Sequence, residues 1–143
     1  MTDFTTRYLS DYQVSNFSIT NVDLTFELAD TTTIVTNIMA IKRDNQNTKQ
    51  LVLDGEQLKL ISLHVNHEVL TKNSYQTSGT QLTIDINADE FILTIVTEID
   101  PLNNTSLEGL FKSGGAFCTQ CEAEGFRRIT YFLDRPDVMA TFS

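Results

Sequence analysis

The amino-acid sequence predicts an all-β fold, a β-sandwich. Three observations predict it: apolar and polar residues alternate with period two in several segments, these segments are short and closely spaced, and no convincing helical period occurs before residue 120. At 143 residues the chain has the length of one domain, and only 2 Pro and 6 Gly argue against disorder. The chain is therefore expected to fold as one unit over residues 1–143.

The first strands have the clearest pattern. Residues 22–28 (V-D-L-T-F-E-L) alternate strictly, which places one face in a core and the other in water. Residues 34–41 are rich in β-branched side chains and predict a second strand. Residues 43–50 form a polar connection, and residues 51–53 predict a short strand that ends at a turn of Asp54 and Gly55.

The middle of the chain predicts a hairpin and two more strands. Residues 58–65 and 68–70 flank Asn66 and His67, which is the pattern of a β-hairpin. After a polar stretch, residues 82–86 and residues 91–99 alternate again.

The last 30 residues change character. Gly114 and Gly115 interrupt the chain, residues 117–122 are predicted to be extended, and residues 125–132 to make one short helical turn. Residues 139–143 predict the opening of another strand, so the β-sandwich is expected to be incomplete at its C-terminal end.

The charge balance restricts the possible partners. The chain has 10 Lys and Arg against 19 Asp and Glu, a formal net charge of −9, and an acidic surface repels phosphate backbones and anionic lipids. No apolar run approaches the ~20 residues of a membrane span, and the first residues lack the features of a signal peptide. We therefore expect a cytoplasmic protein that binds neither nucleic acid nor membrane, and whose surface suits cations and protonated amines.

Two patterns imitate zinc sites. Residues 67–71 (H-E-V-L-T) lack the second histidine of H-E-x-x-H and lie at a predicted hairpin instead of on a helix. A site of His64, His67, Cys118 and Cys121 would need a wider histidine spacing, and in an extended segment the two cysteines point to opposite faces. No metal ligand is therefore assigned, and the cysteines are expected to be free thiols. No nucleophile motif such as G-x-S-x-G occurs, so no catalytic residue is assigned either.

The remaining candidate site is the segment 119–128 (T-Q-C-E-A-E-G-F-R-R). In an extended backbone, Gln120 and Glu122 project from the same face. A carboxylate beside an amide oxygen suits a primary ammonium, which brings three donors and a positive charge. The alternative is a solvated acidic edge that Arg127 and Arg128 balance.

A longer pattern runs through the same region: residues 119–127 are T-Q-x-E-x-x-x-x-R, and residues 134–136 are D-x-P. In this pattern the chain resembles the aminopeptidase N family of zinc metalloaminopeptidases. Its residues in the pattern are most similar to those of the bacterial branch. Phe132 departs from the proline that many relatives carry two residues before the aspartate. The resemblance also covers four earlier segments, residues 8–12, 22–28, 53–58 and 107–110.

The resemblance implies a saddle-shaped N-terminal β domain that abuts a thermolysin-like zinc domain. The G-A-M-E-N and H-E-x-x-H motifs of that zinc domain have no counterpart in this chain. By resemblance, Glu122 would hold the free α-ammonium of a peptide, and Gln120 would line the pocket for its first side chain.

Residues 1–143 are thus expected to be the substrate-anchoring part, truncated, of a longer zinc aminopeptidase. The expected partners are the N-terminus of a peptide substrate and the catalytic domain of the same chain. The zinc would belong to that domain, and residues 1–143 alone are expected to bind none and to be inactive. The alternative, from a different class of protein, is a non-catalytic β-sandwich that binds a peptide or protein partner.

Overall fold

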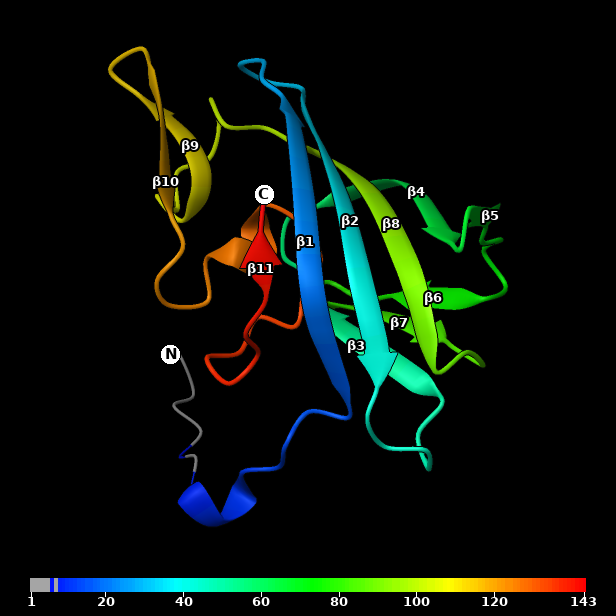
Figure 1. Ribbon diagram of the computed structural model, residues 1–143. Coiled ribbons are helices and arrows are strands. Elements are labelled where there is room, and N and C mark those ends of the chain that lie inside the picture. The colour runs from blue at the N-terminus through cyan, green and yellow to red at the C-terminus, as the bar shows by residue number, and fades with distance from the viewer. Residues whose placement is uncertain (1–5, 7) are drawn as a thin grey trace.

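The computed structural model describes residue 6 and residues 8–143. This part of the chain is almost entirely β, as predicted, with two single-turn 3-10 helices (Figure 1). The strands are β1 (Phe17–Glu27), β2 (Thr33–Arg43), β3 (Gln50–Asp54), β4 (Lys59–Val65), β5 (Glu68–Val69), β6 (Tyr75–Thr77), β7 (Gln81–Asp85), β8 (Glu90–Ile99), β9 (Gly109–Ser113), β10 (Ala116–Gln120) and β11 (Thr141–Phe142). The 3-10 helices are η1 (Leu9–Asp11) and η2 (Phe126–Arg128).

The strands form two facing sheets and a separate hairpin. The large sheet has the order β11-β1-β2-β8-β4-β5, the smaller one has the order β3-β7-β6, and β9 pairs with β10 alone. Neighbours in the sheets are antiparallel except β1 and β11, which are parallel. In Figure 1 the smaller sheet lies behind the large one. The predicted β-sandwich is therefore confirmed.

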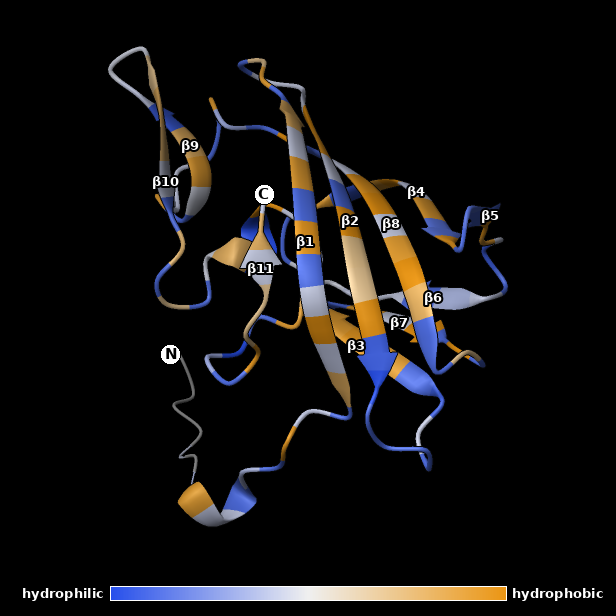
Figure 2. Ribbon diagram, in the orientation of Figure 1, coloured by the Kyte–Doolittle hydropathy of each residue, from blue (hydrophilic) through white to orange (hydrophobic). Residues whose placement is uncertain are grey.

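Alternation along the strands builds the core between the two sheets. Buried side chains come from β3, β7 and β8, where orange segments mark the apolar residues in Figure 2. The side chains in question are Leu51, Leu53, Leu82, Ile84, Phe91, Leu93 and Ile95. Full burial of one such side chain contributes roughly 1.5–3 kcal/mol, so this set alone supplies a large part of the driving force for folding.

Most of the strands expected from the sequence are present, with a few corrections. Strand β1 starts at Phe17, before the predicted residue 22, and β6 lies in a stretch predicted to be polar connection. The Gly114-Gly115 pair does not interrupt the β structure. It is the turn between β9 and β10, and its φ angles of 57° and 85° are those of a two-residue hairpin turn.

The C-terminal residues pack against the start of the large sheet. Strand β11 is parallel to β1, with Asn21 opposite Thr141, so a strand is present within the predicted residues 139–143. The Phe142 ring contacts Phe126 and Phe132 at centroid distances of 5.8 and 5.9 Å. Among the described residues, none of the helices has the length and apolar character needed to cross a membrane.

Candidate functional site

The β9–β10 hairpin places the candidate residues at its end. Gln120 is the last residue of β10 and pairs with Gly109. The outer edge of β9 is fixed by the preceding loop, because Lys112 N–H donates to the Pro101 carbonyl at 2.9 Å. Asn104 Nδ2 donates to the Leu110 carbonyl at 3.0 Å on the same edge. The hairpin is therefore held on one side and presents Gln120 at its base.

The turn after Gln120 corrects the extended geometry predicted for residues 117–122. Strand β10 ends at Gln120, and Glu122 lies in a turn whose Glu122–Ala123 peptide bond is cis. Gly125 N–H closes this turn on the Cys121 carbonyl at 2.9 Å. Gln120 Nε2 donates to the Glu122 backbone carbonyl at 2.8 Å. Gln120 and Glu122 are therefore joined through a hydrogen-bonded turn and not through the alternation of a strand.

Gly125 makes this closed turn possible. A Cβ atom at this position would overlap the Gln120 carbonyl oxygen and would lie 2.9 Å from the Cys121 Cα. Its φ of −90° is one that other residues adopt, so the restriction comes from space and not from the backbone angle. Gly125 also leads into η2, where its carbonyl accepts a hydrogen bond from Arg128 N–H at 3.1 Å.

Arg127 and Asp134 join the two halves of the sequence pattern. Arg127 Nε donates to Asp134 Oδ2 at 3.0 Å, and Nη2 donates to the Asp134 carbonyl at 3.1 Å. The backbone N–H of Arg127 donates to the same Oδ2 at 3.2 Å. Each side chain is only 14% exposed. The arginine of T-Q-x-E-x-x-x-x-R and the aspartate of D-x-P therefore form one half-buried ion pair.

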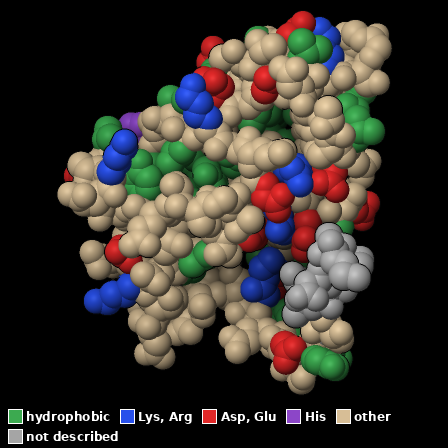
Figure 3. Space-filling view, turned by 180° about the vertical axis from the view of Figure 1, so that it is seen from behind, with side chains coloured by type: hydrophobic (Ala, Val, Ile, Leu, Met, Phe, Trp, Pro, Cys, Tyr) green, Lys and Arg blue, Asp and Glu red, His purple; other side chains and the backbone are tan. Residues whose placement is uncertain are grey.

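Two further carboxylates approach Arg127. Its Nη2 lies 3.6 Å from Glu124 Oε1 and 4.0 Å from Asp54 Oδ2. Burial raises the pKa of the Asp54 carboxyl above its ordinary value, while the positive charge of Arg127 acts in the opposite direction. These residues border a groove of about 790 Å³. Seen from behind, acidic and basic side chains gather next to one another (Figure 3).

Glu122 stands outside this charge network. Arg128 pairs with Glu56 and Glu108, both at 2.9 Å, and the Arg127 contacts are those given above. The two arginines thus neutralise acidic neighbours, as the alternative interpretation expects, but no described residue hydrogen-bonds or ion-pairs with the Glu122 carboxylate. Glu122 and Gln120 are exposed. The Gln120 amide nitrogen is engaged by the Glu122 backbone carbonyl, and its Oε1 oxygen makes no described hydrogen bond and can accept one.

The residues of the second zinc pattern are not brought together. His64 lies in β4 and His67 in the β4–β5 turn, whereas Cys118 lies in β10 (Figure 1). Cys121 lies beyond β10, so the two cysteines are not on opposite faces of one strand, as had been expected. Cys121 is half-buried against the apolar cluster that includes Ile129, and burial raises its thiol pKa. Within the described residues, no three His, Cys, Asp or Glu side chains are placed to hold a metal.

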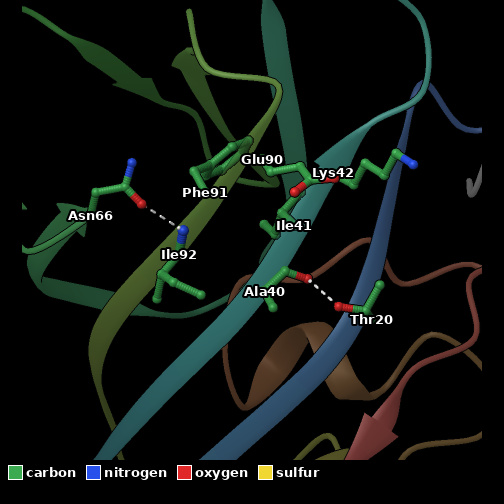
Figure 4. A pocket seen from close by; sticks show the side chains of 8 residues that line it. All are labelled: Thr20, Ala40, Ile41, Lys42, Asn66, Glu90, Phe91 and Ile92. Carbon is green, nitrogen blue, oxygen red and sulfur yellow. Dashed lines mark hydrogen bonds between the residues drawn. The ribbon is translucent and has the colours of Figure 1, made fainter.

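A separate hollow of about 460 Å³ lies on the large sheet (Figure 4). Two of its polar side chains already bond to strand backbone: Asn66 Oδ1 accepts from Ile92 N–H at 2.9 Å, and Thr20 Oγ1 donates to the Ala40 carbonyl at 3.3 Å. The hollow is lined by residues of β1, β2 and β8 and by Asn66 of the β4–β5 turn, all far from the β9–β10 hairpin in sequence. It gives no specific support to the alternative of a non-catalytic binding module.

Comparison with known proteins shows which family this chain resembles. Residues 12–143 match the Peptidase M1 N-terminal domain. Aminopeptidase N of Escherichia coli (strain K12) is 47% identical over 137 residues, which are 96% of this chain and 16% of the relative. Aminopeptidase N of Caulobacter vibrioides is 46% identical over 135 residues, 94% of this chain and 16% of the relative. The chain therefore spans only a small part of the length of these curated relatives.

The solved structures agree in fold. Legionella pneumophila aminopeptidase A, in complex with aspartic acid, superposes with a TM-score of 0.87 at 32% identity, over 95% of this chain and 16% of that one. Native yeast LTA4 hydrolase superposes with a TM-score of 0.73 at 20% identity, over 89% of this chain and 22% of that one. The fold is thus that of an N-terminal β domain of M1 peptidases. This chain belongs to the Peptidase M1 N-terminal domain family, and the resemblance to bacterial aminopeptidase N is confirmed.

Proposed function

We propose that this chain is the substrate-anchoring domain of a longer zinc-dependent aminopeptidase, which removes N-terminal residues from peptides. One observation carries the proposal: Glu122 is exposed on a closed turn, and Gln120 Nε2 donates to its backbone carbonyl at 2.8 Å, at the positions that match the family pattern. The relatives with 45–47% identity over nearly all of this chain are named aminopeptidases, which supports the same activity for the longer protein.

In this proposal the α-ammonium of a peptide donates to Glu122. A charge-assisted hydrogen bond of this kind contributes roughly 1.5–3 kcal/mol, and a blocked, uncharged amine lacks it. Gln120 accepts a further hydrogen bond from the ammonium or lines the pocket for the first side chain. Because the turn is closed before substrate arrives, little ordering is needed on binding. Holding the amine at a fixed place limits cleavage to the first peptide bond.

The described residues do not fit a zinc site, since no group of three ligand side chains is placed together. We therefore assign the zinc to the catalytic domain of the longer protein. That domain is the proposed partner of this one, and it would shield Glu122 from water. In such a shielded site the charge of Glu122 interacts more strongly with an ammonium than it does in water. The two cysteines are free thiols, which supports a cytoplasmic location because disulfides persist in oxidising compartments.

The proposal is tested by comparing the longer protein with residues 1–143 alone. The longer protein is expected to hold zinc and to hydrolyse leucine p-nitroanilide but not its N-acetyl form. Residues 1–143 alone are expected to hold no stoichiometric zinc and to hydrolyse neither compound. Metal analysis near one zinc per shorter chain would overturn the assignment of the metal, and equal hydrolysis of both compounds by the longer protein would overturn the amine site.

A further inference from the structure

We propose that Arg127 is a positioning residue for the amine site: its ion pairs fix the turn that carries Glu122. This inference rests on the proposed function, because it assigns Arg127 a role in ammonium binding and not only in folding. Arg127 does not contact the Glu122 carboxylate, and its described contacts go to Asp134, Glu124 and Asp54. Its effect on the ammonium would therefore be indirect.

The Asp134 end of this connection is anchored in the core. Phe132 and Leu133, which precede Asp134, are buried. The Phe132 backbone is also paired with β3: Phe132 N–H donates to the Asp54 carbonyl at 3.0 Å, and Asp54 N–H donates to the Phe132 carbonyl at 2.8 Å. Asp134 is thus a fixed point, and three hydrogen bonds hold Arg127 against it.

The other end of the connection lies in the turn. Two hydrogen bonds hold the turn from within, from Gly125 N–H to the Cys121 carbonyl and from Gln120 Nε2 to the Glu122 carbonyl. Residues 122–124 stay exposed to solvent on the side of the turn away from these two hydrogen bonds. On that side, Glu124 forms an ion pair with Arg127, with Oε1 at 3.6 Å from Nη2. Glu124 is two residues from Glu122. Arg127 therefore connects the exposed part of the turn to the anchored Asp134.

The geometry requires a guanidinium and not only a positive charge. One planar group contacts the Asp134 carboxylate, the Asp134 carbonyl and the Glu124 carboxylate. A lysine ammonium is a compact point charge on a flexible stem and cannot hold these acceptors in one fixed arrangement. Arg127→Lys keeps the charge among the three carboxylates but loosens the tie to the turn.

The test uses the zinc-loaded longer protein and a pair of inhibitors without a scissile amide bond, leucinol and 4-methylpentan-1-ol, of which the second lacks the amine. The ratio of their inhibition constants measures how strongly the site selects the amine. Glu122→Ala is expected to abolish most of this selection. Arg127→Lys is expected to reduce it about tenfold, within the range seen for coupled residues. In the double variant, Arg127→Lys is expected to add nothing to the loss caused by Glu122→Ala.

The outcomes separate the two proposals. If Glu122→Ala leaves the ratio unchanged, both the amine site and the role of Arg127 are overturned. If Glu122→Ala lowers the ratio but Arg127→Lys does not, only the role of Arg127 is overturned. The same holds if Arg127→Lys lowers the ratio equally in the original protein and in the Glu122→Ala variant. A purely structural role would weaken both inhibitors together and leave the ratio intact. Should Arg127→Lys fail to fold, Glu124→Gln removes the ion pair between Arg127 and Glu124 at the Glu124 side chain, which is 55% exposed. A lower ratio in that variant supports the proposal, and an unchanged ratio contradicts it.

Discussion

Arg127 Nε and Asp134 Oδ2 are 3.0 Å apart across seven residues of sequence, and each side chain is only 14% exposed. Through the contact of Arg127 with Glu124, this pair connects the turn that carries Glu122 to Asp134, two residues after Phe132, which is bridged to Asp54. It explains why a spaced sequence pattern contains both residues. The arginine and the aspartate serve as a structural support, while Gln120 and Glu122 face outward.

Asp134→Ala should destabilise the folded chain by about 1.5–3 kcal/mol, because a half-buried arginine loses its charged hydrogen-bond partner. Asp137→Ala provides a matched control, since Asp137 pairs with Arg135 at 2.6 Å nearer the surface. An ion pair of that kind contributes under ~1 kcal/mol. Urea unfolding of the two variants measures the difference. A loss at Asp137 equal to or above that at Asp134 would contradict the supporting role of the Arg127 pair.

Gly125→Ala should cost about 1–3 kcal/mol of stability, because its Cβ would overlap the Gln120 carbonyl and force the turn to open. Gly79→Ala is the control, since nothing lies within 4 Å of the added atom. We expect that variant to stay within about 0.5 kcal/mol of the original protein. Thermal unfolding followed by circular dichroism tests both. Equal midpoints for the two variants would mean that the turn has room which the structure does not show.

The Cys121 thiol should react slowly with iodoacetamide at pH 8. Burial, with a smaller contribution from the negative charge of Asp134, raises its pKa. Less thiolate is then present at a given pH, and the thiolate is the reactive form. In a Cys118→Ser variant, where Cys121 alone reports, the midpoint of the rate against pH should lie above that of a cysteine in an unstructured peptide, about 8.5. A midpoint at or below the peptide value would show that the thiol is not buried as described.

The sequence predicts strands well where alternation is long and fails where structure depends on distant pairing. Residues 91–99 alternate over their whole length, and the structure forms β8 there. Strand β6 has three residues and is recognisable only through its pairing with β7. Strand β9 likewise depends on its hairpin with β10, and its buried residues do not alternate.

The sequence predicts which residues belong to the candidate site, but it does not predict how they are arranged. Gln120 and Glu122 are indicated by a local motif, but the turn between β10 and η2 depends on Gly125 fitting against the Gln120 carbonyl. Arg127 and Asp134 are both in the motif pattern, yet no periodicity shows that they contact each other. The signal that could have indicated this contact was the opposite charge of an arginine and an aspartate seven residues apart in the pattern.

The kinetics of Glu122→Ala in the zinc-loaded longer protein test the central claim most directly. If Glu122 binds the ammonium in a site that the catalytic domain closes to water, kcat/KM should fall by about 30-fold to several thousand-fold, equivalent to ~2–5 kcal/mol. The control is Glu68→Ala in the exposed β5, because Glu124 contacts Arg127 and is not neutral. That control should lose well under ~1 kcal/mol. Equal, small losses for the two variants would contradict the anchoring role of Glu122.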